Sequence, residues 1–216
     1  NKVKLVELNS KLEGLFSTFS SKLLGDEKLY TFVLNQAELD GLPAGFISSL
    51  ADAAEAQGKP GQWAIKNTRS SAQPVLQNAT NRALREKVWR AFVNRGDNGD
   101  ANDTNATIAE ILKLRQERAV LLGFPTHADY RMADTMAKTP ANAMALMMKV
   151  WPAAGARAKE EVADMQAIAD QEAKAGKGPK ITIEPWDYRY YAEKVRKAKY
   201  DLDESEVKPY LQLDKL

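Results

Sequence analysis

The residues of this chain best suited to contact a ligand are concentrated in the stretch WDYRYY at residues 186–191. Aromatic faces and a carboxylate suit an extended peptide, so these residues are candidates for lining a peptide-binding channel; the candidates are Trp186, Asp187, Tyr190 and Tyr191. The alternative is structural. Asp187 would cap the helix that begins here, because its side-chain oxygen can accept hydrogen bonds from the free amides of the first turn, and the rings would pack against neighbouring helices. The sequence favours the structural alternative and leaves both open.

A zinc centre is not expected from the residue types that the chain offers. The sequence holds one histidine, His127, and no cysteine, whereas a tetrahedral zinc site needs three or four nitrogen, sulfur or oxygen ligands. His127 stands at the expected start of a helix, where a lone histidine is more commonly a surface or capping residue than a ligand. We therefore predict no catalytic and no metal-binding residue within this chain.

The segment DNGDANDTN at residues 97–105 is polar and rich in turn-forming residues. Its alternating Asp and Asn suggest a calcium-binding loop. However, neither the frame from Asp97 nor that from Asp100 places oxygen ligands at the first, third and fifth positions with glycine at the sixth. We interpret the segment as a loop whose end caps the next helix, with Asp103 or Thr104 at the N-cap.

Basic residues alternate with tyrosines in the last expected helix and raise the question of nucleic-acid binding. They are Arg189, Lys194, Arg196, Lys197 and Lys199. On a helix these residues are spread around much of the surface, and the net charge of the chain is only +2. The sequence therefore predicts no nucleic-acid partner.

The composition is that of an ordinary globular protein. Of the 216 residues, 44% are hydrophobic and 28% are charged, which permits a core of normal size. No apolar run reaches the roughly 18 residues that a membrane-spanning helix needs, and the first residues lack the layout of a signal peptide. The absence of cysteine is compatible with the cytoplasm. We predict a cytoplasmic protein with no membrane partner.

Apolar residues recur every three or four positions over most of the chain, which predicts a mainly α-helical fold. The expected helices start near residue 1, after Pro43, near Pro74, at Thr80, at Asn105, after Pro125, at Pro140 and at Trp186-Asp187. Two short strands are expected at Trp63–Thr68 and Ile181–Glu184, and they could pair with each other. Leu29–Leu34 is expected to be extended or a connection, and Gln36–Leu39 a single helical turn. The expected fold class is a multi-helix array with at most one small two-stranded β element.

The longest expected helix starts at Thr139-Pro140, where a capping threonine precedes a proline at the first helical position. Pro152 interrupts the hydrogen-bond ladder of this helix, which predicts a kink or a break between Met148 and Pro152. Met144, Met147 and Met148 are most simply adaptable filling of the core. A hinge beside Pro152 is the alternative.

No repeat, low-complexity segment or linker marks an internal domain boundary in residues 1–216. Residue 1 is already in helical register, and the final LQLDKL is apolar. We therefore expect a helical fragment that is truncated at both ends. Near its end, Asp203 with Glu206 three residues later has the spacing of a capping box.

The run ITIEPWDYRYYAEKVRKAKYDLDESEVKPY occupies residues 181–210. Its pattern EPWD…YYAE…R…YDLDE…KPY resembles the segment that precedes the catalytic domain in thimet-oligopeptidase-like zinc metallopeptidases. Similar runs occur at residues 73–91, 102–124 and 128–140, so the resemblance covers essentially the whole chain. The wording LLGFPTHADY and MAKTP favours the bacterial peptidyl-dipeptidase branch.

The resemblance implies a parent enzyme that cleaves short peptides in a channel between two helical halves. Its zinc is held by two histidines of an HExxH helix and a more distant glutamate, and this sequence contains no HExxH. The chain is thus expected to supply scaffold and channel wall and to be inactive alone. Its partners would be the remaining catalytic half of the polypeptide, which holds the zinc, and short peptide substrates. The alternative is a stand-alone helical binding or scaffolding module without catalysis.

Overall fold

A computed structural model describes residues 2–200 and confirms a mainly α-helical array with one two-stranded sheet. In chain order, the elements are α1 (Lys2–Glu27), β1 (Tyr30–Val33), the 3-10 turn η1 (Gln36–Leu39), α2 (Ala44–Ala56), β2 (Trp63–Lys66), α3 (Arg69–Asn78), α4 (Arg82–Val93), α5 (Asn105–Leu121), α6 (His127–Met132), α7 (Pro140–Lys174) and α8 (Tyr188–Tyr200). The capping box expected at residues 203–206 lies outside the described residues.

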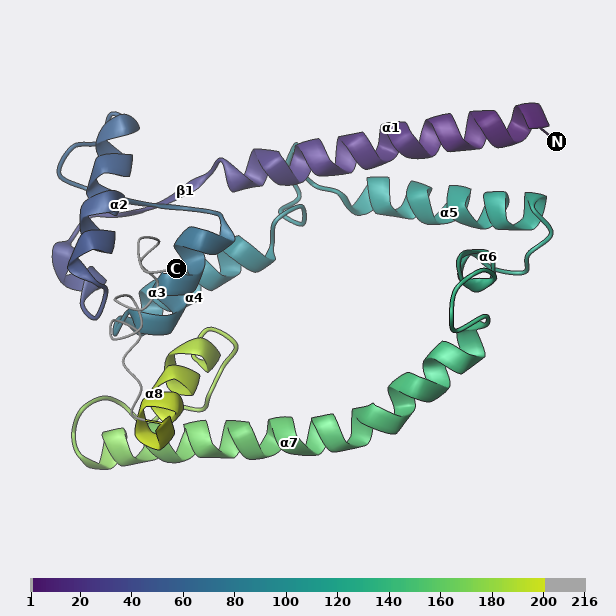
Figure 1. Cartoon of the computed structure of the whole chain (residues 1–216). Helices are drawn as coiled ribbons and strands as arrows, with labels where there is room; N and C mark the ends of the chain where they lie inside the picture. Colours follow the sequence, from purple (N-terminus) through teal and green to yellow (C-terminus); the bar gives the residue numbers. More distant parts are fainter. Residues whose placement is uncertain (1, 201–216) are drawn as a thin grey trace, which may run out of the picture.

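The helices form two long arms joined at both ends (Figure 1). Helices α1 and α5 lie side by side in one arm, and α7 forms the other. At one end, α6 connects α5 to α7; at the other, α8 packs against both α7 and α3, beside the sheet and α2–α4. The residues around α8 are therefore positioned by elements from both arms.

The core consists of three hydrophobic clusters that follow this arrangement. The first fills the space between the sheet and α2–α4 and includes Leu50, Ile65, Val75, Leu84 and Val88. The second joins α1 to α5 through Leu8, Leu12, Ile111 and Leu114. The third joins α7 to α8 through Met165, Ala169 and Tyr191. Most of the periodic apolar positions seen in the sequence thus form real helix contacts.

The pairing of the sheet differs from the sequence prediction. Strand β2 was expected correctly, but its antiparallel partner is β1, with Tyr30 opposite Lys66 and Val33 opposite Trp63. The prediction of a strand at Ile181–Glu184 is wrong. The side chain of Gln166 in α7 donates to Ile181 O at 2.8 Å and accepts from Ile183 N–H at 3.0 Å. This side-chain amide thus satisfies backbone hydrogen-bonding groups that a neighbouring strand would otherwise satisfy.

Helix α7 starts as the sequence predicts and runs unbroken through Pro152. The hydroxyl of Thr139 accepts a hydrogen bond from Asn142 N–H, and Pro140 occupies the first turn. The helix is bent in its first half (Figure 1), the half that contains Pro152, whose ring removes one N–H donor from the ladder. A break is therefore absent, and the bend agrees with the expected kink.

Contrary to the prediction, the three methionines before Pro152 do not fill a core within residues 2–200. Met144, Met147 and Met148 are each 54% exposed, because no described element covers this part of α7. Their helical spacing is real, but periodicity reports only that a face is apolar. It does not report which segment covers that face.

Candidate functional site

The structure brings the four candidate residues of the peptide channel together where α8 begins. Trp186 and Asp187 lie in the turn before α8, and Tyr190 and Tyr191 lie in its first part. Helix α8 packs against α7 on one side and α3 on the other. Asp187 and Tyr191 are buried, whereas Trp186 and Tyr190 are half-buried.

The carboxylate of Asp187 is 0% exposed and is paired with two arginines near the start of α4. Arg82 donates through Nη2 to Oδ2 at 2.8 Å and also through Nε, at 3.1 Å. Arg85, itself 2% exposed, donates through Nη2 to Oδ1 at 2.8 Å. The second nitrogen of Arg85, Nη1, donates to the carbonyls of Ala79 and Thr80. The ion cluster therefore ties the beginning of α8 to the beginning of α4.

The expected N-cap role of Asp187 is not what the hydrogen bonds show. Its Oδ2 accepts from Glu184 N–H at 3.2 Å, which lies before α8 and not in its first turn. Burial by itself would raise the pKa of Asp187, but the hydrogen bonds from Arg82, Arg85 and Glu184 N–H outweigh burial and leave the pKa below its ordinary value. Asp187 is therefore an ionised structural partner in this fold, and its oxygens are already occupied by protein donors.

Trp186 is held between aromatic and cationic side chains of α4. Its ring meets Trp89 edge-to-face, with 5.7 Å between centroids. The guanidinium of Arg90 lies 5.0 Å and that of Arg82 lies 5.6 Å from the Trp186 ring centre. The indole N–H of Trp186 is buried and has no hydrogen-bond partner within residues 2–200.

The two tyrosines connect α8 to α7. Tyr190 and Tyr191 meet edge-to-face at 5.2 Å between centroids, and the guanidinium of Arg85 lies 4.1 Å from the Tyr190 ring centre. The Tyr191 hydroxyl donates to Glu172 Oε2 at 3.3 Å, and Lys194 pairs with the other Glu172 oxygen. These contacts fix the rings in place. That the four candidate residues line a peptide channel stays a prediction.

The raised pKa of Tyr191 leads to a testable pH dependence. Burial first, and then the nearby Glu172 carboxylate, raise the pKa of Tyr191 to about 12. An unfolded chain loses this proton near pH ~10, so the stability that comes from neutral Tyr191 is complete below about pH 10 and is lost as pH rises towards 12. We expect the unfolding free energy of the wild type to fall by about 1 kcal/mol more than that of Tyr191→Phe between about pH 9 and pH 11. Urea unfolding at both pH values tests this. An equal fall in unfolding free energy for the wild type and Tyr191→Phe would contradict it.

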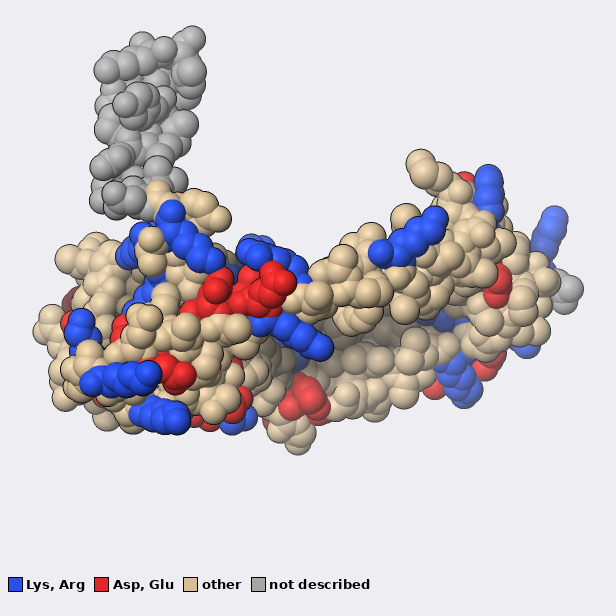
Figure 2. All heavy atoms as spheres, turned by 90° about the horizontal axis from the view of Figure 1, so that it is seen from below, with Lys and Arg blue, Asp and Glu red and all other residues tan. Residues whose placement is uncertain are grey.

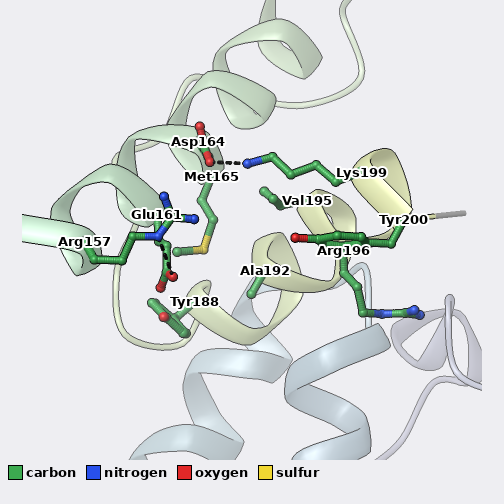
Figure 3. A pocket seen from close by; sticks show the side chains of 10 residues that line it. All are labelled: Arg157, Glu161, Asp164, Met165, Tyr188, Ala192, Val195, Arg196, Lys199 and Tyr200. Carbon is green, nitrogen blue, oxygen red and sulfur yellow. Dashed lines mark hydrogen bonds and ion pairs between the residues drawn. The ribbon is translucent and has the colours of Figure 1, made fainter. Parts of the chain in front are cut away.

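A pocket of about 170 Å³ lies between α7 and α8 (Figure 3). Met165 and Val195 supply apolar lining. Two ion pairs flank it, Arg157 with Glu161 at 3.3 Å and Lys199 with Asp164 at 2.6 Å. The sequence did not predict this pocket, because its two walls come from different helices. No local sequence pattern indicates that these helices are in contact. The four charged side chains of these two ion pairs are thus engaged with one another.

A second polar centre that the sequence did not predict surrounds Asp26, in the last turn of α1. Its buried carboxylate accepts from Gly96 N–H at 2.7 Å, Asn98 Nδ2 at 3.1 Å and Asn102 Nδ2 at 2.8 Å. The only signal in the sequence is the asparagine-rich loop itself. Asp26 is the acceptor around which that loop is ordered.

The loop at residues 97–105 leads into α5, and of the two N-cap candidates only Asp103 accepts a hydrogen bond from the first turn of α5 through its side chain. Asp103 Oδ1 accepts from Asn105 N–H at 2.9 Å. Thr104 is the N-cap residue, yet its hydroxyl donates to Gly96 O at 2.9 Å. Hydrogen bonds from the N–H groups of Asn105 and then Gly99 lower the pKa of Asp103.

The described residues do not fit a metal ion. Within residues 2–200, no three or more His, Cys, Asp or Glu side chains are grouped so that they could share one. His127 is the first residue of α6. Burial and then the charges of Arg115, Arg118 and Arg131 lower the pKa of His127. A cation at His127 would be repelled by these three guanidinium groups.

Within residues 2–200, no helix combines the length and the hydropathy needed to cross a membrane.

Comparison with known proteins gives a consistent result along the chain. Residues 75–216 match the sequence pattern described as peptidase family M3. The chain is 40% identical over 215 residues to a dipeptidyl carboxypeptidase of Escherichia coli, covering 99% of this chain and 31% of that protein. It is 35% identical to a probable cytosolic oligopeptidase A of Arabidopsis thaliana, covering 97% and 30%, and 31% identical to an oligopeptidase A of Haemophilus influenzae, covering 94% and 30%. The chain thus spans a little under a third of the length of these relatives.

Proposed function

The chain belongs to peptidase family M3, and from this premise we propose that it is part of a zinc-dependent peptidase that hydrolyses short peptides. The observation that carries the proposal is the 40% identity to a dipeptidyl carboxypeptidase over 99% of this chain. Since the chain spans only 31% of that relative, the activity proposed is that of the longer polypeptide.

The zinc of this peptidase would be held outside residues 2–200. The described histidine stands among three arginines, and no acidic cluster accompanies it. Bound zinc would polarise the scissile carbonyl and activate a water molecule. We assign no step of that chemistry to the described residues.

The part proposed for this chain is to provide scaffold and one wall of the peptide channel. The ion cluster of Asp187 with Arg82 and Arg85 supports this role, since it holds α8 firmly against α4. Tyr191 and Glu172 hold the same helix against α7. A rigid wall positions a bound peptide near a reacting centre and so lowers the entropic part of the barrier. The partners of the chain in this proposal are the remaining catalytic part of the same polypeptide and short peptide substrates.

A cytoplasmic location also belongs to the proposal. It is supported by the name of the Arabidopsis thaliana relative, a probable cytosolic oligopeptidase.

The test is cleavage of a quenched fluorescent short peptide by the full-length polypeptide. We expect a zinc chelator to abolish cleavage and added zinc to restore it, because the water needs the metal for activation. Residues 1–216 alone should be inactive under the same conditions. Product masses would show whether dipeptides are released from one end or bonds are cleaved internally.

Two results would contradict the proposal. Full-length protein that cleaves no short peptide would favour the alternative, a helical binding module without catalysis. Cleavage that persists in the presence of the chelator would remove zinc from the mechanism.

A further inference from the structure

Helix α7 carries one apolar stripe that is buried at one end and uncovered at the other. Met144, Met148, Trp151 and Met165 belong to it, at the spacings that place residues on one face of a helix. At the α8 end, Met165 and Ala169 are each 2% exposed, because α8 covers them. At the other end, Met144 and Met148 are 54% exposed and Trp151 is 71% exposed. The same surface thus continues beyond the contact that α8 makes.

The uncovered half of α7 is apolar on more than one side. Residues 140–156 contain one charged residue, Lys149, which lies about 140° around the helix from Met144 at 100° per residue. Leu146 and Val150 lie about 160° and 120° around the helix from Met144 and are 66% and 59% exposed. Seen from the side of α7, charged side chains gather mainly at the α8 end and at the opposite tip, with few over the middle (Figure 2). Such a helix is normally buried in protein, and contiguous exposed apolar patches of this kind mark interaction sites.

We infer that the stripe from Met144 to Trp151 is the surface on which an apolar helix from the remainder of the same peptidase polypeptide packs, continuing the contact of α8. The inference rests on the proposed function in one respect, that this chain is part of a longer family M3 polypeptide. The chain spans 31% of the dipeptidyl carboxypeptidase relative, so more than twice its own length of protein is available to cover the stripe.

The chemistry of the stripe favours a helix over an extended peptide as its occupant. Methionine and tryptophan side chains at helical spacing form ridges that fit the grooves of another helix. An extended peptide needs partners for its own backbone N–H and C=O groups. The backbone of α7 is already engaged in its own ladder, and the stripe presents almost no polar side chain.

Single cysteines can report burial of the stripe in the full-length polypeptide, because residues 1–216 contain no cysteine. Met147→Cys, whose methionine is 54% exposed here, tests the stripe. Ala153→Cys is the matched control, since Ala153 is exposed and lies about 120° around the same helix from Met147 and about 180° from Met144. Maleimide labelling is followed by mass spectrometry on the peptide that carries each cysteine, so cysteines elsewhere do not interfere.

We expect native Met147→Cys to be labelled at least about tenfold more slowly than Ala153→Cys, and both to react at similar rates in denaturant. Equal labelling in the native protein would overturn the inference. So would fast labelling of Met147→Cys that slows only when a short peptide is added, which would place a peptide on the stripe. Protection that disappears on dilution would indicate a second copy instead. Peptidase activity of the Ala153→Cys protein is measured separately, so loss of the proposed function and loss of the docking surface are distinguished.

Discussion

Replacing Asp187 with alanine is expected to lower the free energy of unfolding by roughly 3–5 kcal/mol, since removing one partner of a buried ion pair leaves an uncompensated charge. The charge left behind is that of Arg85, whose side chain is 2% exposed. Arg82 is partly exposed and can be rehydrated, so breaking its pair with Asp187 contributes less to the loss of stability.

Asp164→Ala is the matched control for this change. Asp164 also pairs with a cation between α7 and α8, Lys199 at 2.6 Å, but the two side chains are 43% and 46% exposed. An exposed pair of this kind contributes about 0–1 kcal/mol. Adding Arg85→Met to Asp187→Ala should recover part of the loss, because it removes the stranded cation. If Asp187→Ala costs no more than Asp164→Ala in urea unfolding, the buried cluster does not hold α8 in place.

The stabilising contribution of the same cluster should be lost in acid. The pKa of Asp187 is lowered in the folded state, where burial opposes the shift and the two arginines with Glu184 N–H outweigh it. A lowered folded pKa means that the contribution is present above the unfolded value of about 3.9 and is lost as pH falls through the folded value. The acid sensitivity of Asp187→Ala should therefore be smaller than that of the wild type.

The helical framework was predictable because its signals are local. The Thr139-Pro140 start of α7 and the glycine after α5, Gly123 with φ of 85°, are decided by the residues at the helix ends themselves. The pairing of β2 with β1 was not predictable on this basis. A short strand needs a partner supplied by the tertiary fold. Ile181–Glu184 has no such partner strand within residues 2–200 and is hydrogen-bonded by the side chain of Gln166 instead.

The candidate site shows the same division. Local rules assigned Asp187 to a helix cap, which is the nearest use for a carboxylate before a helix. The arginines that engage it are 105 and 102 residues away in the chain. The spacing of Arg82 and Arg85, three residues apart near a helix start, is the only trace of that cluster in the sequence. The prediction for the methionines of α7 failed for another reason, because no described element covers them.

Replacing Asp26 with alanine is expected to cost roughly 2–4 kcal/mol, because each buried donor left without a partner costs about 1–3 kcal/mol. The donors concerned are the buried Gly96 N–H and the side chains of Asn98 and Asn102. A carboxylate near the C-terminal end of a helix is opposed by the helix dipole, so Asp26 is tolerated there only with donors of this kind. Its loss should loosen the loop that connects α4 to α5.

Asp97→Ala separates this effect from a general effect of charge in the loop. Asp97 is exposed and accepts a single hydrogen bond, from Asn105 at 2.7 Å, and its removal should change stability by no more than about 0.5 kcal/mol. Urea unfolding measures both variants, and hydrogen exchange at the Gly96 amide reports the loop directly. For Asp26→Ala, we expect faster exchange at Gly96 together with the larger loss of stability. Unchanged exchange at Gly96 would show that the loop is ordered without Asp26, because the amide that donates to its carboxylate would then have stayed protected.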